Sequence, residues 1–337
     1  MSALRLVKRA AYGAAWRSGT IAALRWLHRD RIPILCYHSI LPDQAAMPPW
    51  LTAWDGGGGL HLPAEQFREQ LEFLARRYRV VPLLDIVAAL AEGRRLPARC
   101  VALTFDDGYA NNLSVAAPLL AEYGLPATIF LATDYIGRGG FFWWDDLRAR
   151  LWTRKELATG RVAGRAALLQ GAELLRAATL DERRHLLDAW GRAGEGGERD
   201  ARRDDAVRPA TWEECRAAPP NIQFGGHGAS HRLLGAIDLE TARQDLHDCR
   251  RALTRELGGS AVPLFCYPAG QWTAPVRAAL PGAGFRAAVI AGPHRSDQRL
   301  ASQADALTLL PRVGVTGGMS LAAFAGRLAG LNGLFGS

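Results

Sequence analysis

The sequence lacks several features that define whole classes of protein. No apolar run in its 337 residues approaches the roughly 20 residues that a membrane-spanning helix needs. Its 36 glycines follow no three-residue period, which excludes a collagen-like chain. Residues of the hydrophobic set make up 49% of the chain, a content that argues against a disordered protein. What remains is a globular chain long enough to bury a large core.

Cysteine is scarce, odd in number and irregularly spaced. The five cysteines form no Cys-x-x-Cys pair, which argues against a zinc ribbon or a thioredoxin-type site. Cys36, Cys100 and Cys266 lie in apolar, strand-like runs, where a free cysteine behaves as a small hydrophobe. The basic N-terminus also lacks the apolar core of a signal peptide. We therefore expect reduced cysteines and a cytoplasmic location.

Positive charge is concentrated in one short arm. Residues 1–31 contain seven lysine and arginine residues against Asp30 alone, so the arm carries +6 of the formal net charge of +8. The rest of the chain is close to neutral and does not resemble a broad nucleic-acid-binding surface. We therefore expect no nucleic-acid partner.

A helical projection of the arm separates its side chains into two arcs. Leu6, Val7, Ala10 and Ala14 fall on one arc, and Arg9 falls on the other. A basic amphipathic helix of this kind can lie peripherally on an anionic inner membrane. It can equally pack on the domain or fray at the chain terminus. Both readings stay open.

From residue 32 onward, short apolar runs alternate with helical periodicity. Strands joined by helices predict parallel βαβ units in an α/β fold, where ligands bind at the carboxyl ends of the strands. A charged helical segment at about 141–211 interrupts this alternation, which then resumes. We therefore predict one domain over residues 32–337 with a helical insertion. The expected strands are Ile32–Tyr37, Val80–Pro82, Cys100–Phe105, Ala127–Ala132, Ile222–Phe224, Leu264–Tyr267, Ala287–Ile290 and Leu307–Val313.

Two polar motifs follow expected strands. Asp106 and Asp107 end the run Cys100–Phe105, and His227 and His231 come soon after Ile222–Phe224. Taken separately, the first motif suggests an ordinary turn with a helix cap, and the second suggests surface histidines. Taken together, they meet on one face of a parallel sheet. One Asp and two His form a common ligand set for catalytic zinc, and the second carboxylate can then act as a base.

Tryptophan pairs mark two further segments. Trp143 and Trp144 open the insertion, and Trp50 and Trp54 lie in a long loop. Aromatic faces stack on sugar rings, so either pair is a candidate to line a carbohydrate groove. The alternative is that these side chains cap the core.

The chain resembles the polysaccharide deacetylases, carbohydrate esterase family four, and most closely its bacterial members found with envelope and exopolysaccharide synthesis. The resemblance implies a distorted (β/α) barrel that hydrolyses N-acetyl or O-acetyl groups on sugars. The segments that carry it are YHSI (37–40), TFDDGY (104–109), LPATIFLATDYIG (125–137) and TWEECRAAPPNIQFGGHGASHRLL (211–234).

Residue by residue, the resemblance makes Asp106 the catalytic base and Asp107, His227 and His231 the metal ligands. The backbone N–H of Tyr109 would help to hold the oxyanion. Zinc is the expected metal, and cobalt or nickel suit the same donors.

Departures from the family pattern concern the base and the acid. Cys266 stands where an arginine usually orients the base, and Arg312 stands where a histidine usually supplies the acid. We therefore expect Arg312 to stabilise the oxyanion or to bind an anionic group of the substrate. The proton for the leaving group would then come from His38, from His294 or from Asp106 itself. Pro268, in the segment FCYPAGQW, is a further candidate for substrate contact.

These expectations lead to three hypotheses. The first is a metal-dependent deacetylase of an N-acetylated sugar, in a polysaccharide or a lipid-linked glycan precursor. The second is a carbohydrate-binding protein on a deacetylase scaffold with weakened chemistry. The third is hydrolysis of another amide or an ester by the same site. The oligomeric state stays open.

Overall fold

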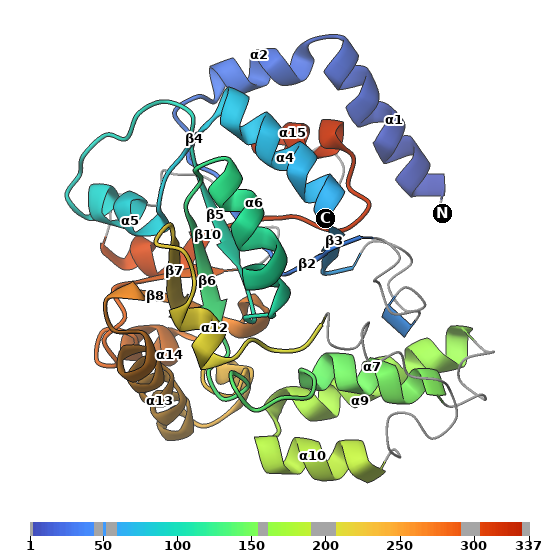
Figure 1. Ribbon diagram of the computed structural model, residues 1–337, viewed down its shortest axis with the longest axis vertical. Coiled ribbons are helices and arrows are strands. Elements are labelled where there is room, and N and C mark those ends of the chain that lie inside the picture. Colours follow the sequence, from blue (N-terminus) through green and yellow to red (C-terminus); the bar gives the residue numbers. More distant parts are fainter. Residues whose placement is uncertain are drawn as a thin grey trace.

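The computed structural model describes residues 3–43, 50–51, 59–153, 161–189, 207–290 and 304–331 (Figure 1). Its strands are mostly short, apolar and buried on both faces, as parallel strands under helices must be. The strands are β1 (Ile34–Tyr37), β2 (Ser39–Leu41), β3 (His61–Pro63), β4 (Arg79–Val80), β5 (Cys100–Phe105), β6 (Ala127–Leu131), β7 (Ile222–Gly226), β8 (Ala261–Cys266), β9 (Ala287–Ile290), β10 (Leu310–Pro311) and β11 (Val313–Gly314).

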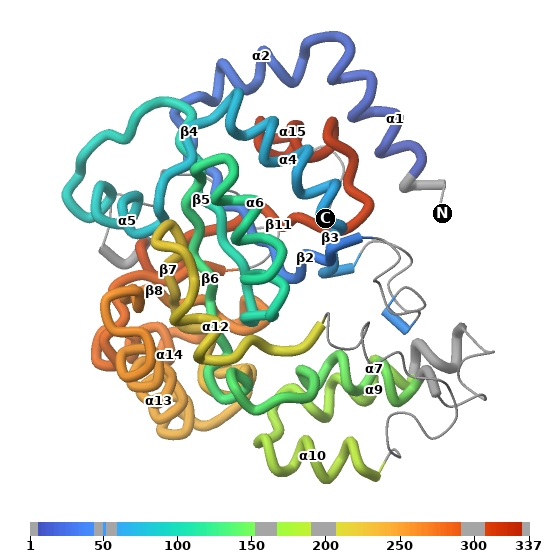
Figure 2. Tube along the Cα trace, viewed as in Figure 1, coloured from blue at the N-terminus to red at the C-terminus, as the bar shows by residue number. Residues whose placement is uncertain are grey.

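Eight parallel strands form a nearly closed barrel, which confirms the fold class. Their order is β10-β9-β8-β7-β6-β5-β1-β11, and β4 pairs with the start of β5. The two outer strands are neighbours in sequence: Leu310 pairs with Val289 of β9, and Val313 pairs with Leu35 of β1. Residues 310–314 thus bridge the two edges of the sheet, and Arg312 lies between β10 and β11. Strand β11 is labelled on the trace in Figure 2.

The end of the chain differs from the expected strand over Leu307–Val313. A 3-10 helix, Ala304–Leu309, precedes β10, and Arg312 interrupts the pairing after it. The apolar run has strand propensity, but its pairing is set by two different neighbouring strands. The prediction of one continuous strand was therefore wrong here.

Helices surround the barrel and close its outer surface. Helix α13 shows why they form: Asp238 caps its start, a glycine at 258 ends it, and Ala242, Leu246 and Cys249 face the core. Among the described residues, no helix has both the length and the apolar content to cross a membrane. The α-helices are α1 (Ala3–Arg17), α2 (Thr20–Leu27), α4 (Ala64–Arg77), α5 (Leu83–Ala91), α6 (Ala117–Glu122), α7 (Trp143–Thr153), α9 (Arg161–Ala177), α10 (Leu180–Ala189), α12 (Trp212–Arg216), α13 (Leu239–Leu257), α14 (Ala274–Ala279) and α15 (Leu321–Leu328); a π-helical turn (Asn112–Ala116) precedes α6, and short 3-10 turns lie at Leu234–Ala236, Gly258–Ser260 and Pro268–Gly270.

The segment expected as an insertion forms the helices α7, α9 and α10. These helices and the loop after β6 share one hydrophobic cluster. The helices contribute Leu147, Leu175 and Leu187 to it. These helices and the pair α1–α2 lie at opposite ends of the long axis of the molecule (Figure 1). The insertion therefore lies beside the carboxyl ends of the strands, whereas the N-terminal arm packs far from them.

Candidate active site

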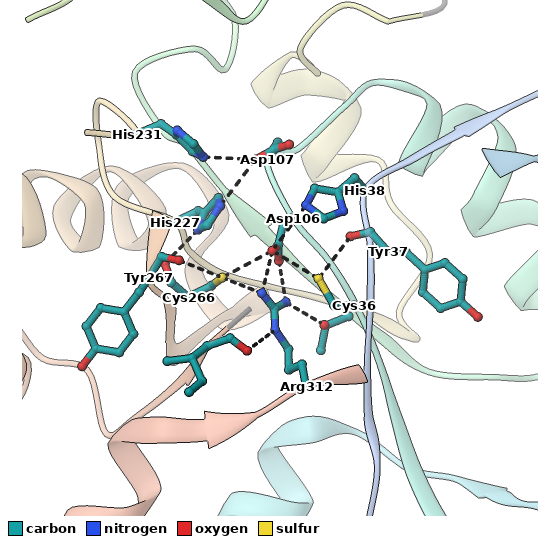
Figure 3. Close-up of polar contacts among 12 residues, drawn as sticks. Cys36, Tyr37, His38, Asp106, Asp107, His227, His231, Cys266, Tyr267 and Arg312 are labelled. Carbon is teal, nitrogen blue, oxygen red and sulfur yellow. Dashed lines mark hydrogen bonds and ion pairs between the residues drawn. The ribbon is translucent and has the colours of Figure 1, made fainter. Parts of the chain in front are cut away.

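The carboxyl ends of three strands bring polar side chains to one mouth of the barrel (Figure 3). Asp106 and Asp107 follow β5, His227 follows β7, and His38 follows β1. Asp106, Asp107 and His227 are at most 2% exposed. The sequence-predicted residues of the two motifs therefore do meet in space.

A left-handed turn lets both adjacent carboxylates face this mouth. Successive residues of a strand point to opposite sides, but Asp107 and Gly108 leave β5 with φ angles of 73° and 91°. A side chain at Gly108 would place its Cβ 2.6 Å from Leu131, so only glycine fits there. Asp107 has no such freedom, and its positive φ is a strained conformation typical of functional sites.

Asp107, His227 and His231 form a group suited to a divalent metal. Asp107 Oδ1 lies 3.4 Å from His227 Nε2 and 3.3 Å from His231 Nε2. Ligands at about 2.1 Å around a tetrahedral ion are about 3.4 Å from one another, so these spacings match the edges of such a site. Burial would raise the pKa of Asp107, but hydrogen bonds with the two histidines hold it below its usual range. The donor set is therefore an ionised carboxylate with two imidazoles.

The orientation of His227 also fits this role. Its Nδ1 donates to the carbonyl oxygen of Cys266 at 2.8 Å, which fixes the ring orientation and makes Nε2 the atom that faces Asp107. The Nδ1 of His231 is buried without a hydrogen-bond partner in the described part of the chain.

Asp106 is held by a buried, two-pronged ion pair with Arg312. The Nη1 and Nη2 atoms of Arg312 each donate to one carboxylate oxygen at 2.6 Å, and the arginine side chain is 0% exposed. The thiols of Cys36 and Cys266 each lie 3.5 Å from Asp106 Oδ2. Burial alone would raise the pKa of Asp106, but the guanidinium holds it well below its usual range. Asp106 is therefore ionised and fixed in direction.

The position of Arg312 corrects the role expected for it. Its guanidinium is bound to Asp106, donates to Thr104 Oγ1 at 3.0 Å, and is enclosed, so it does not reach toward a substrate anion or an oxyanion. Instead, it orients Asp106, which is the role that the resemblance expects of an arginine at the position of Cys266. Cys266 makes this position of Arg312 possible. Its small thiol lies 3.0 Å from Arg312 Nη2 and leaves room for the guanidinium.

Two residues that sequence reasoning missed hold the histidine loop. Asp245 of α13 accepts from the backbone N–H groups of Ala229 (2.8 Å) and Ser230 (3.1 Å) and from the Ser230 hydroxyl (2.6 Å). Arg183 of α10 is buried and donates to the carbonyl oxygens of Ser230 (2.5 Å) and His231 (3.2 Å). A carboxylate within the apolar stripe of α13 was a readable signal for Asp245, whereas Arg183 gave none.

Asp245 also limits which residue can follow His227. Gly228 has a φ of 74°, and a Cβ there would lie 2.9 Å from Asp245 Oδ1. Glycine therefore suits this loop for a steric reason.

Trp144 forms one wall of the metal group. Its ring centroid lies 4.4 Å from that of His231, and its Nε1 donates to the Tyr109 hydroxyl at 2.8 Å. That hydroxyl donates in turn to Asp145 at 2.7 Å. The insertion thus reaches the site through a ring that packs on His231 and through two hydrogen bonds.

The structure does not support Trp143 as a sugar-stacking residue. Trp143 is 7% exposed, and the guanidinium of Arg183 lies over its ring at 5.4 Å. Trp50 is also buried, against Phe141, so both side chains follow the alternative of capping the core. Trp54 lies outside the described residues.

The remaining predicted residues take different positions. His38 Nε2 lies 3.9 Å from Asp106 Oδ2, and its side chain is 17% exposed. The Tyr109 backbone N–H has no acceptor among the described residues, while its side chain is buried. Pro268 is buried beside Gly228, and its contact with substrate stays a prediction. His294 lies outside the part of the chain that the structure describes.

At the mouth of the nearly closed parallel barrel, an oriented carboxylate lies beside a candidate metal group, an arrangement suited to hydrolysis. The family model described as polysaccharide deacetylase matches residues 93–288, more than half of the chain. The chain therefore belongs to the polysaccharide deacetylase family.

A curated relative matches a smaller region. The Bacillus subtilis (strain 168) protein named "Putative polysaccharide deacetylase YxkH" is 32% identical over 116 residues, which are 33% of this chain and 37% of that protein. The match thus spans little more than a third of that relative.

Solved structures share the fold over most of their length. Streptococcus pyogenes deacetylase PplD in complex with acetate is 17% identical, with a TM-score of 0.56 over 87% of this chain and 96% of that one. IcaB from Ammonifex degensii is 17% identical, with a TM-score of 0.54 over 89% of this chain and 97% of that one. At these identities the likeness concerns the fold alone.

Proposed function

We propose that the protein is a metal-dependent deacetylase that removes the acetyl group from an N-acetylated sugar of a polysaccharide or a lipid-linked glycan precursor. One observation carries this proposal. Asp106, ionised and oriented by Arg312, lies directly beside Asp107, His227 and His231, whose donor atoms have the spacing of a metal site. A protein that only binds carbohydrate needs neither a buried, oriented base nor such a ligand group.

Asp107, His227 and His231 would hold the metal, and zinc is the first choice for a carboxylate with two imidazoles. Such an ion, when bound, polarises an acetyl carbonyl and makes water more acidic at neutral pH. Cobalt and nickel suit the same ligands.

The chain itself supplies the proton acceptor and one oxyanion donor. Asp106 accepts the proton of the attacking water, and Arg312 keeps its two oxygens fixed in the plane of the guanidinium. The backbone N–H of Tyr109, on the turn after Asp107, donates to the oxygen that becomes negative in the transition state.

His38 is the proton donor that the geometry favours for the leaving amine. It is partly exposed at the mouth, with Nε2 3.9 Å from Asp106 Oδ2. Asp106 can therefore pass on the proton it has taken, either through His38 or directly. Imidazole is the side chain best suited to give and take protons near neutral pH.

The test measures bound metal and acetate release on one preparation. Substrates are N-acetylglucosamine oligomers and a polyprenyl-linked N-acetyl sugar, and Asp106→Asn is the matched variant. We expect bound metal in both proteins and acetate only from the unchanged chain. Loss of about 10²–10⁴-fold in His38→Gln on amides, with a smaller loss on an acetate ester, would support His38 as the acid. A protein that binds no metal while Asp107, His227 and His231 are intact would contradict the proposal.

A further inference from the structure

The two N-terminal helices expose apolar side chains of a size that folded surfaces usually cover. Among the described residues, five of the eight exposed large hydrophobic side chains lie between residues 6 and 27. Trp26 is 67% exposed, Leu27 63%, Val7 62% and Leu6 50%. Such a concentration marks an interaction surface rather than scattered exposed residues.

The exposure follows from how the helices are anchored. Tyr12 of α1 is 7% exposed and packs so closely on Gly326 of α15 that a Cβ there would lie 2.6 Å from its ring. Ile21 anchors α2 in the same way, at 2% exposed. The arc of α1 that includes Leu6 and Val7 lies on the other side of the helix and faces solvent. The domain-packing reading therefore accounts for one face of the arm, while Leu6 and Val7 on the other stay exposed among the described residues.

The exposed positive charge of the arm indicates which kind of partner its outer face would bind. Arg9, Arg17 and Arg29 are exposed on the same two-helix arm, in which Asp30 is the one acidic residue. The Arg29 guanidinium lies 4.7 Å from the Trp26 ring, so a cation and an interfacial aromatic stand side by side. Tryptophan and arginine are the side chains that lie best at the headgroup level of a membrane.

A groove beside the arm carries slightly more positive than negative charge. It has a volume of about 300 Å³ and lies between α2 and α4. The Arg25 guanidinium lies 5.9 Å from the ring centroid of Phe73, and both side chains line the groove. Its charged lining is Arg25, Arg76 and Arg77 against Glu69 and Glu72.

We propose that α1 and α2 dock the protein on a membrane surface rich in anionic lipid. Leu6, Val7, Trp26 and Leu27 enter the headgroup region, and the arginines of the arm contact lipid phosphates. Because the insertion helices lie at the other end of the molecule, the mouth of the barrel then faces away from the lipid (Figure 1).

The test is co-sedimentation of the full chain with vesicles. One set is phosphatidylcholine alone, and the other is phosphatidylcholine mixed with phosphatidylglycerol. We expect binding to the anionic vesicles, weakened by salt because exposed charges are screened. Trp26→Ser with Leu27→Ser should lower the affinity about tenfold or more. Arg9→Ser and Arg29→Ser should each lower it about fivefold at low salt.

A matched control comes from the insertion. Leu169 and Leu174 of α9 are 62% and 54% exposed, so Leu169→Ser with Leu174→Ser removes similar apolar surface elsewhere. This control should bind as the unchanged chain does. Equal binding to both vesicle types, or no binding to either, would overturn the proposal. So would a loss of affinity in the control as large as that in Trp26→Ser with Leu27→Ser. So would a dimer in light scattering that the Trp26 and Leu27 change converts to monomer. No readout depends on acetate release, so failure of the proposed activity would leave this result unaffected.

Discussion

Arg312 and Asp106 lie 206 residues apart in sequence and form two parallel hydrogen bonds of 2.6 Å inside the barrel. The arginine is carried by the junction between β10 and β11, where the sheet closes on itself. The same five-residue segment therefore completes the barrel and orients the carboxylate that we propose as the base. A change in this segment should therefore affect both barrel closure and the orientation of Asp106.

Replacing Arg312 should damage both stability and activity. Arg312→Gln leaves Asp106 buried without its cation, and breaking a buried pair in this way costs about 3–5 kcal/mol of unfolding free energy. Its removal also raises the pKa of Asp106, so the acid limb of kcat/KM should move to higher pH. Arg312→Lys keeps the charge without the two-pronged geometry. Its stability and activity should lie between those of Arg312→Gln and of the unchanged chain.

A surface ion pair provides the control for this change. Arg216 pairs with Glu256 at 2.9 Å, and its side chain is 51% exposed. Arg216→Gln should cost no more than about 1 kcal/mol in urea unfolding and leave the pH profile unchanged. A pH profile of Arg312→Gln that matches the unchanged chain would show that Arg312 is merely structural.

Local sequence patterns were sufficient for much of the barrel. The strands Cys100–Phe105 and Ala287–Ile290 have the bounds that their apolar runs predicted. The polar motifs were informative because both follow strands, and carboxyl ends of parallel strands share one edge.

The role of Arg312 could not be read in the same way. Arginine is rarely buried, and its burial depends on a partner 206 residues away. The split of the last strand likewise depends on which edges β10 and β11 meet. Both are tertiary effects, which local propensity does not contain.

Asp245 should control how firmly the histidine loop holds metal. Asp245→Ala removes the acceptor of three hydrogen bonds from Ala229 and Ser230, next to His231. Loss of such supporting contacts typically lowers metal affinity about 10–100-fold. Competition of the purified protein with a zinc-binding dye would measure the change.

The control for Asp245 lies one turn further along the same helix. Asp248 is partly exposed and contacts Gln244 and Arg251. Asp248→Ala should leave zinc affinity as it is, and Asp245→Asn should recover part of the loss by keeping one acceptor oxygen. If both aspartate variants lose affinity equally, the loop contacts are not the cause.

Trp144 and its neighbour should respond differently to the same substitution. Trp144→Phe keeps a ring against His231 but removes the hydrogen bond to Tyr109, which is worth about 1 kcal/mol. Trp144→Ala removes the wall as well and should weaken zinc binding. Trp143→Phe changes packing alone, because the Trp143 Nε1 has no partner among the described residues. Zinc affinity that falls in Trp143→Phe and not in Trp144→Ala would contradict this assignment.

Asp145 should make stability depend on pH in an unusual direction. Burial raises its pKa to about 7, although Arg148 at 3.2 Å and the Tyr109 hydroxyl favour the ionised form. The group that faces it at 3.9 Å, His61, has a pKa lowered to about 3 by burial and stays neutral above that pH. The folded state therefore keeps a proton on Asp145 between about pH 4 and pH 7, where the unfolded chain has lost it. Because the folded state binds more protons there, the unfolding free energy falls as pH rises through this range.

Asp145→Asn removes this penalty while an amide oxygen can still accept from Tyr109. Urea unfolding of both proteins from pH 4 to pH 8, with chelator present so that metal release does not enter, gives their difference at each pH. Every other titrating group cancels in this difference. The unchanged chain should lose stability relative to Asp145→Asn up to about pH 7, by an amount on the order of 4 kcal/mol, and the difference should then be constant. A difference that instead moves in favour of the unchanged chain as pH rises would mean that Arg148 dominates and that the buried carboxylate next to the site is ionised throughout.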